Sequence, residues 1–342
     1  MGFVAPALGL DLGTSNTLVY VKNKGIVVSE PTIEVVDSTN ERNVRAVGDD
    51  AKIMLGRTTE GVMAVKPMHE GVITDFDITK ILIQYFKRKA IGSSHLIPPQ
   101  LFLSYPCSLS SIERRAVSEA AQHARFRKVY MIEKPVLAAV GSGLPVFEAN
   151  GCMVVDIGGG TTDVAVISLG GVVISHSIRV GGTKMDEAII DFIKREFNIL
   201  IGDRTAEEVK LDLAAALPLR AERRARIRGR DMVTNLPQTT EINSTQIYEA
   251  IHEPCMAILG AIKWVLERTP PELAADIMHN GIYLTGGGSL LYGMDQLIAS
   301  ELGIPVLLAK EPMDCAALGL GNIIENYELL QQLGRTSFIT NA

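Results

Sequence analysis

The chain has 342 residues, 47% of them hydrophobic and 21% charged, which is enough for the cores of about two soluble domains. Its net charge of −6 excludes a general attraction to nucleic acid, so no nucleic-acid partner is expected. The four cysteines form no C-x-x-C pair, which argues against zinc or redox motifs and favours reduced thiols in the cytoplasm. Neither a signal peptide nor a membrane-spanning apolar run is predicted.

Segments with strand and helix patterns alternate along the whole chain, which is typical of the α/β class. Ser110 or Ser111 is expected to cap one helix and Thr205 another. In chain order, the sequence predicts strands at 7–10, 17–21 and 25–30, a helix at 77–89, a strand at 100–106, a helix at 108–126, a strand at 128–133 and a helix at 135–144. A second strand–turn–strand unit follows from 153, then helices at 183–198, 205–217 and 247–270, and a strand, turn and helix at 281–291. An interruption near Pro254 is the alternative for the helix at 247–270.

One pattern occurs twice in the chain. An aspartate and a glycine-containing turn join two apolar strands around Asp11, in "LDLGTSNT", and again around Asp156, in "VVDIGGGTTD". The separation from Asp11 to Asp156 is much longer than the repeat of a solenoid, which is about 20–50 residues. The repeat therefore predicts two duplicated domains. The two turns would then face each other across a cleft.

Both turns have the composition of a phosphate-binding loop. Glycine lets backbone N–H groups approach a ligand, consecutive N–H groups form an anion-binding nest, and Ser and Thr add hydroxyl donors. The aspartate before each turn suits a hydrated Mg²⁺ that bridges to the phosphates. A third turn, "TGGGS" at 285–289, follows a strand and opens a helix, which suits a nucleoside or α-phosphate contact at a helix N-terminus.

Any one of these turns alone is more often an ordinary hairpin turn. Their number and the duplication favour the phosphate-binding interpretation. The sequence contains no Walker A pattern, and no G-x-G-x-x-G with a downstream acidic residue follows a strand. P-loop and Rossmann dinucleotide binding are therefore disfavoured.

These three motifs resemble the two phosphate motifs and the adenosine motif of the superfamily of actin, sugar kinases and DnaK-type chaperones. The segments "KPMHEGVITDF", "IRVGGTKMDEAI" and "LERTPPELAADI" resemble the MreB family, the bacterial actins that organise cell-wall synthesis in rod-shaped cells. The resemblance extends from about residue 8 to 325, which is nearly the whole chain.

The resemblance implies an α/β, actin-like (ribonuclease H-like) duplicated fold. Two large domains, each with a five-stranded mixed sheet and a small subdomain, would enclose a nucleotide cleft. The expected boundaries are 1–31, 67–140 and 310–342 for the core of domain I, 32–66 for its small subdomain, 141–181 and 243–309 for the core of domain II, and 182–242 for its small subdomain.

The resemblance also implies that ATP or ADP binds in this cleft with Mg²⁺. The phosphates would be held from domain I by Gly13, Thr14, Ser15 and Asn16, and from domain II by Gly158, Gly159, Gly160 and Thr161. Asp11 and Asp156 would face the metal through water. The ribose and adenine would be bordered by Glu207, Glu208 and Lys210, and the nucleoside would be covered by Gly286, Gly287, Gly288 and Ser289.

Hydrolysis needs a water molecule aimed at the γ-phosphorus. The segment "MIEKP" resembles the family's "IEEP", which implies Glu133 as the water-orienting base and Thr161 as a second water contact. A solvated strand end is the alternative for Glu133. Two positions depart from the family pattern. Lys134 replaces the second glutamate and is expected to lower the basicity of Glu133, and Asp163 replaces a glutamate.

The resemblance further implies homopolymer filaments that lie on the cytoplasmic membrane and act with membrane proteins of cell-wall synthesis. The loop "AIGSSHLIPPQ" carries Leu96 and Ile97, which are predicted to enter the bilayer; the alternative is that both side chains pack into the core. Lys87, Arg88 and Lys89 precede this loop and suit anionic headgroups.

Some alternatives remain open. The chain could be a soluble ATPase of the chaperone or sugar-kinase type, although neither a substrate domain nor a convincing set of sugar-binding residues is predicted. A plasmid-segregation actin would share only the phosphate motifs. The arginine-rich stretch from Arg220 to Arg230 fits a solvated face, an acidic partner or a longitudinal filament contact.

Overall fold

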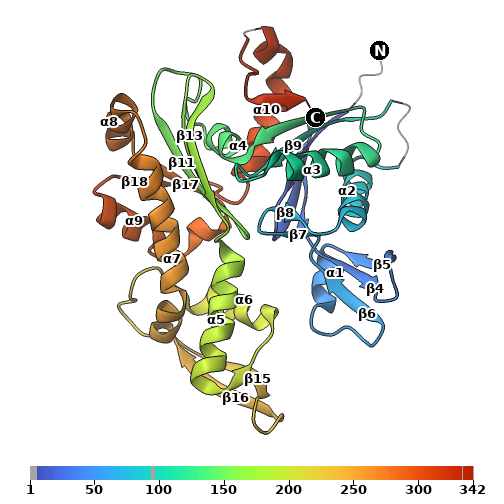
Figure 1. The fold of residues 1–342 in the computed structure, drawn as a ribbon, viewed down its shortest axis with the longest axis vertical. Coiled ribbons are helices and arrows are strands. Elements are labelled where there is room, and N and C mark those ends of the chain that lie inside the picture. Colours follow the sequence, from blue (N-terminus) through green and yellow to red (C-terminus); the bar gives the residue numbers. More distant parts are fainter. Residues whose placement is uncertain (1–5, 94–96, 333, 342) are drawn as a thin grey trace.

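The computed structural model describes residues 6–93, 97–332 and 334–341. Its strands form two large sheets, two three-stranded sheets and one short ribbon. Figure 1 shows the large sheets in the upper half, with a smaller α/β unit below each of them. This arrangement confirms the expected α/β class and the two similar halves that the repeated turn motif predicts.

The first large sheet has the strand order β19-β10-β9-β1-β2-β3. A sheet of five strands was expected from the family resemblance, and this expectation is wrong by one strand. The extra strand β19 pairs antiparallel with β10, and the hydroxyl of Thr340 donates to the carbonyl of Met131 at 3.1 Å. The strands are β1 (Ala7–Leu12), β2 (Asn16–Val21), β3 (Gly25–Pro31), β9 (Gln100–Tyr105), β10 (Lys128–Glu133) and β19 (Ile339–Asn341).

The second large sheet repeats the plan of the first. Its order is β13-β12-β11-β17-β18. In both sheets an antiparallel meander of three strands is followed by parallel strands, because β9 runs parallel to β1 and β17 runs parallel to β11. The strands are β11 (Cys152–Ile157), β12 (Thr162–Ser168), β13 (Gly171–Ile178), β17 (Ile282–Thr285) and β18 (Val306–Leu308).

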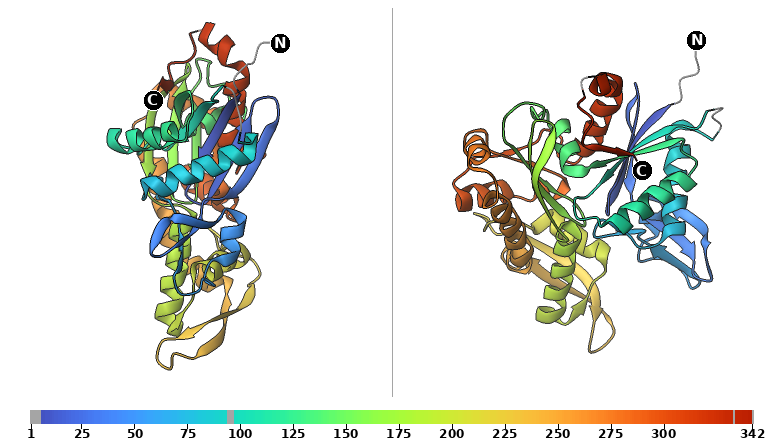
Figure 2. Two further views of the ribbon diagram at one scale, coloured as in Figure 1. Left: turned by 90° about the vertical axis from the view of Figure 1, so that its right-hand side faces the viewer. Right: turned by 45° about the horizontal axis from the view of Figure 1, so that its top comes forward.

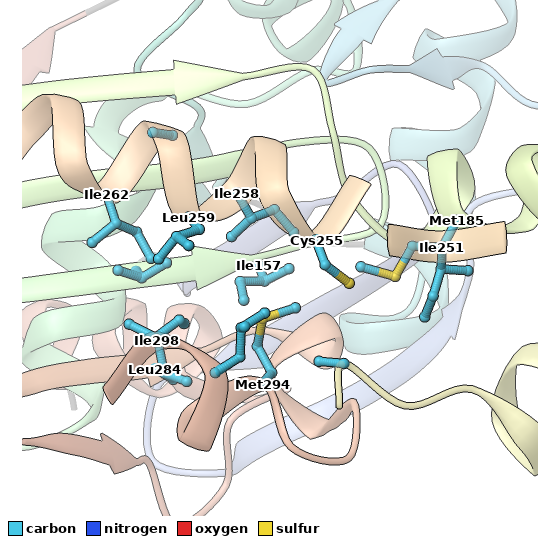
Figure 3. Packing of buried hydrophobic residues seen from close by; sticks show 14 of the residues in the cluster. Ile157, Met185, Ile251, Cys255, Ile258, Leu259, Ile262, Leu284, Met294 and Ile298 are labelled. Atoms are coloured by element: carbon cyan, nitrogen blue, oxygen red, sulfur yellow. The ribbon is translucent and has the colours of Figure 1, made fainter. Parts of the chain in front are cut away.

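Helices cover the outer face of each large sheet. Helices α2 (Phe76–Ile91) and α3 (Ser111–His123) contribute buried residues to the core of the first sheet. The second sheet is covered by α7 (Ser244–Leu266), α8 (Pro271–Asn280) and α9 (Met294–Leu302). Figure 3 shows Ile157 of β11 packed between Ile258 of α7 and Met294 of α9. These apolar contacts fix the end of β11 from which the second glycine turn extends.

Two further helices lie between the sheets. Helices α4 (Lys134–Gly141) and α10 (Cys315–Gln332) form a core with residues of both sheets, and Figure 2 shows α10 standing between the two halves. Their backbones touch, because a Cβ on Gly141 would overlap the carbonyl of Cys315 and a Cβ on Gly319 would overlap that of Leu137. Glycine is therefore required at this crossing.

Each half of the molecule carries a smaller unit. In the first, the sheet β5-β4-β6 packs on α1. In the second, the sheet β14-β15-β16 packs with α5 and α6. The elements are β4 (Glu34–Asp37), β5 (Asn40–Val47), α1 (Asp49–Met54), β6 (Val62–Val65), the ribbon β7 (Met68–His69) and β8 (Val72–Ile73), α5 (Gly182–Phe197), β14 (Ile199–Leu200), α6 (Asp203–Leu213), β15 (Arg224–Asp231) and β16 (Pro237–Asn243).

Candidate functional site

A cavity of about 350 Å³ lies where the glycine turns of the two halves meet. Most of the residues expected from the sequence lie in its wall, together with residues that were not expected. The expected ones are Asp11, Gly13, Thr14, Ser15, Asn16, Asp156, Gly158, Gly159, Gly160, Thr161, Glu207, Lys210, Gly286, Gly287 and Gly288.

The first two glycine turns are closed by an equivalent backbone hydrogen bond. Each connects an antiparallel hairpin, β1–β2 in one half and β11–β12 in the other. The N–H of Gly13 donates to the carbonyl of Asn16 at 3.2 Å, and the N–H of Gly158 donates to the carbonyl of Thr161 at 2.8 Å. The repeated sequence pattern therefore corresponds to a repeated local structure.

The second turn also rests on the N-terminus of α5. The N–H groups of Gly182 and Thr183 donate to the carbonyls of Gly158 and Gly159 at 3.0 and 2.8 Å. A helix N-terminus carries a partial positive charge and favours a bound anion. Gly182 itself lines the cavity, but the first N–H groups of α5 are already bonded to the turn, so this end of the helix contributes its partial positive charge to the wall and not free donors.

The two turns touch each other across the cavity. A Cβ on Gly159 would lie 2.8 Å from the Cβ of Ser15, and one on Gly160 would lie 2.9 Å from the Cβ of Thr14. The N–H of Gly71 donates to the hydroxyl of Thr14 at 3.1 Å and holds the first turn in place. The expected facing arrangement is thus present, with small residues at the points of closest approach.

Two buried carboxylates stand at the base of the turns. Asp11 accepts a hydrogen bond from the hydroxyl of Ser104, and Asp156 accepts one from the hydroxyl of Thr285 at 3.0 Å. Both aspartates line the cavity and are nearly inaccessible to solvent. Carboxylate oxygens are preferred by Mg²⁺, which usually keeps several of its waters. The residues present therefore fit a hydrated divalent cation.

Lys134 is a cavity residue whose contact the sequence did not reveal. Its ammonium lies 2.9 Å from a carboxylate oxygen of Asp156. Burial lowers the pKa of a lysine, but the charges of Asp156 and Asp11 outweigh burial and raise the pKa of Lys134. Lys134 was expected to act on Glu133; its ion pair is instead with Asp156, because Lys134 begins α4 and points into the cavity.

Thr161 and Asp163 form a second polar contact next to the turn. The hydroxyl of Thr161 donates to Asp163 at 3.1 Å, and the N–H of Cys107 donates to the same carboxylate at 3.0 Å. Burial and then the charge of Asp156 raise the pKa of Asp163 to about 6. Thr161 is therefore held in a fixed orientation at the cavity wall.

Three of the expected residues lie outside the cavity wall that the described residues form. Glu133 ends β10 on the side of Cys107, whose thiol lies 3.7 Å from its carboxylate. Glu208 points outward on α6 and pairs with Arg204 at 3.0 Å. Ser289 is buried, and its hydroxyl donates to the carbonyl of Gly286 at 2.6 Å. It therefore stabilises the third turn without lining the cavity.

The neighbouring residues on α6 do reach the cavity. Lys210 pairs with Asp186 at 2.8 Å and donates to the carbonyl of Gly182 at 3.0 Å, which ties α6 to the start of α5. A carboxylate oxygen of Glu207 lies 3.3 Å from the ammonium nitrogen of Lys52, which belongs to the other half. The helix begins at Asp203, two residues before the expected cap at Thr205.

The loop after α2 is described only in part. Leu96 lies outside the described residues, and Ile97 is half-buried. Lys87 donates to the carbonyls of Ala124 and Arg125 at 3.0 and 2.9 Å, and Lys89 pairs with Glu30, so both ammonium groups are engaged within the protein. None of the described helices combines the length and apolar character needed to cross a bilayer.

Several wall residues were missed by sequence reasoning. Lys134 carried a signal, since it departs from the family pattern. Ser104 in the wall and Thr285 outside it are single hydroxyls at or next to strand ends, and only the pairing of β9 with β1 and of β17 with β11 brings them to the aspartates. Other unexpected wall residues are Gly71, Gly182, Arg223, Tyr292 and Met313.

The family model described as MreB/Mbl protein matches residues 5–332. The chain belongs to the MreB/Mbl family. The resemblance found in the sequence is thereby confirmed. A curated member of this family, the cell shape-determining protein Mbl of Bacillus subtilis, is 46% identical over 323 residues, which cover 94% of this chain and 97% of Mbl. MreB of Escherichia coli K12 is 46% identical over 332 residues, which cover 96% of each chain.

Solved structures agree with this family assignment. MreB5 of Spiroplasma citri bound to AMPPNP superposes with a TM-score of 0.91 at 32% identity, over 97% of this chain and 100% of that one. The chain of the MamK double helical filament superposes with a TM-score of 0.78 at 20% identity, over 94% of this chain and 99% of that one, which shows a shared fold.

Proposed function

We propose that this MreB/Mbl family member binds ATP and ADP in the cavity between its halves and polymerises into filaments that determine cell shape. The observation that carries the proposal is the pair of facing glycine turns, each preceded by a buried aspartate, around one cavity. Its relatives support it: MreB and Mbl are named as cell shape-determining proteins, and MreB5 of Spiroplasma citri is bound to AMPPNP in one structure and to ADP in another.

The site residues divide the work of binding. The turns from Gly13 to Asn16 and from Gly158 to Thr161, with the N-terminus of α5, would hold the phosphates. Asp11 and Asp156 would hold a hydrated Mg²⁺, which supplies positive charge to the phosphates. The wall formed by α6 and the third turn, with Glu207, Lys210 and residues 286–288, would border the nucleoside.

The polymer would also hydrolyse ATP slowly. Phosphoryl transfer needs mainly positioning and charge stabilisation, and Thr161 is fixed at the wall by Asp163. Glu133 remains the proposed base. Its carboxylate contacts the thiol of Cys107 and lies outside the cavity wall, so it must move before it orients a water molecule, which supports a slow reaction.

The filament would act in the cytoplasm on the inner surface of the membrane, through the loop that carries Leu96 and Ile97, together with membrane proteins of cell-wall synthesis. Burial of one large apolar side chain contributes about 1.5–3 kcal/mol. Two such side chains give a monomer only about millimolar affinity. Many copies in one filament bind together by avidity, so attachment would depend on polymerisation.

Sedimentation separates this proposal from a soluble ATPase of the chaperone or sugar-kinase class. With ATP and Mg²⁺, the protein should pellet above a threshold concentration, and without nucleotide the threshold should rise. Protein that stays in the supernatant at every concentration, while it binds ATP, would overturn the filament function and favour the soluble ATPase.

A further inference from the structure

We propose that Lys134 supplies an internal positive charge at the cavity, so that a nucleoside triphosphate binds with a reduced requirement for a divalent cation. The inference deepens the proposed function, because it rests on nucleotide binding at this site. It concerns Lys134, which stands where the family pattern has a glutamate.

The position of the ammonium carries the first step. Lys134 is the first residue of α4, directly after β10, and its nitrogen lies 2.9 Å from Asp156. The same nitrogen would lie 3.6 Å from a Cβ on Gly158. It therefore lies between the metal-facing carboxylate and the second glycine turn, where phosphate and cation are expected to meet.

Burial makes this charge effective. The side chain of Lys134 is 16% exposed and that of Asp156 is 3% exposed. Charges separated by a few ångströms interact much more strongly at such positions than at the surface, because the effective dielectric constant is lower. Without Lys134, the side-chain donor that the described residues leave to the carboxylate of Asp156 is the neutral hydroxyl of Thr285.

The other cations of the described wall are engaged elsewhere. Lys210 is held by Asp186 and by the carbonyl of Gly182, and the guanidinium of Arg223 lies 3.5 Å from the carbonyl of Asp212. Within the described part of the chain, neither Lys210 nor Arg223 forms an ion pair or hydrogen bond with Asp11 or Asp156. Lys134 is thus placed to neutralise the aspartate that would otherwise need Mg²⁺ before a phosphate could approach.

The test measures the affinity for a fluorescent ATP analogue in Mg²⁺ and in EDTA, by titration of folded monomer below its polymerisation threshold. The quantity compared between variants is the dissociation constant in EDTA divided by the dissociation constant in Mg²⁺. For the unchanged protein, we expect EDTA to weaken binding only modestly. For Lys134→Met, the ratio should be at least about tenfold larger, because one partner of a buried charge pair has been removed. Lys263→Met, which breaks a surface pair with Glu301, is the matched control and should keep the original ratio.

A second variant covers the case in which Lys134→Met folds poorly. In the double variant Lys134→Met plus Asp156→Asn, the carboxylate that loses its ammonium partner is also neutralised, so the protein should fold and its affinity in EDTA should recover. An equal ratio in the unchanged protein and in Lys134→Met would overturn the inference, and so would a failure of the double variant to recover. Absence of binding by the unchanged protein in Mg²⁺ would instead overturn the proposed function.

Discussion

Gly160 of the second glycine turn lies against Thr14 of the first, so close that a Cβ on Gly160 would lie 2.9 Å from the Cβ of Thr14. The two residues belong to different halves of the chain and are brought together only by the facing of the duplicated hairpins. Their distance therefore determines how far the halves can close around a ligand.

Gly160→Ala should weaken ATP binding by at least about tenfold, because the added methyl group forces the turns apart and interiors tolerate such overlap poorly. Titration with a fluorescent ATP analogue measures the effect. Gly202→Ala is the control, because a Cβ at Gly202 meets no atom within 4 Å. Equal affinity of both variants would show that the turns do not close on the nucleotide.

Asp156→Asn should reduce the gain in ATP affinity that Mg²⁺ provides. The substitution keeps the shape of the side chain and its contact with Thr285 but removes the charge that faces the cation. The measurement is the dissociation constant in Mg²⁺ and in EDTA, with Asp276→Asn outside the cavity as the control. An unchanged response to Mg²⁺ would contradict the assignment of Asp156 to the metal.

Glu133→Ala should retain ATP binding and slow phosphate release, by about 10²–10⁴-fold if Glu133 is the base. Lys134→Glu is the informative companion, because position 134 lines the cavity and position 133 does not. Phosphate release by the polymer is the measurement. Unchanged release in Glu133→Ala, with faster release in Lys134→Glu, would show that the neighbouring position is the one suited to orient the water.

Leu96→Ser combined with Ile97→Ser should abolish co-flotation with anionic liposomes while ATP-dependent pelleting persists, because the apolar contact with the bilayer is lost. Met278→Ser combined with Leu329→Ser is the control, since both are exposed and belong to other helices. Equal flotation of the two double variants would exclude the loop as the anchor.

Glu34 gives a prediction for stability against pH. Its carboxylate is buried on β4, and neither oxygen has a hydrogen-bond partner in the described part of the chain. Burial and then the charge of Asp75 raise its pKa from 4.5 to about 8. The folded protein therefore holds a proton that the unfolded chain releases, and stability falls as the pH rises from about 4.5 to about 8.

Glu34→Gln should remove this loss, so the variant should gain stability relative to the unchanged protein most clearly above pH 8, by a few kcal/mol at about 1.4 kcal/mol for each pKa unit. Thermal unfolding across pH measures the difference. Glu60→Gln, at an exposed position, is the control. Parallel stability curves for the unchanged protein and Glu34→Gln would contradict the raised pKa.

Much of the fold could be predicted because local signals agree with it. Ser110 and Glu113 form the capping box that starts α3, and β10 ends at Glu133 as its apolar run indicates. Helix α7 continues through Pro254, which is buried among its neighbours, so tertiary packing overrides the local effect of proline there. The strand β19 carries a weak local pattern and forms because β10 offers it a free edge.

The candidate site could be predicted where function depends on backbone, and less well where it depends on the direction of a side chain. Glycine turns can be recognised in the sequence, because only small residues fit where Gly159 contacts Ser15. The adjacent residues Glu133 and Lys134 point to different surroundings because the strand ends and α4 begins between them. The sequence does not show where that boundary directs each side chain.

The crossing of α4 and α10 has a mechanical consequence. At Gly141 and Gly319 the two backbones are in direct contact, so the helices cannot slide along each other without steric overlap. Tightly packed elements of this kind move as rigid bodies. We therefore expect the two halves to rotate about this crossing, with the tips of the β15–β16 hairpin and of the β4–β6 sheet farthest from the axis. A small change of angle at the glycine turns becomes a larger displacement at those tips.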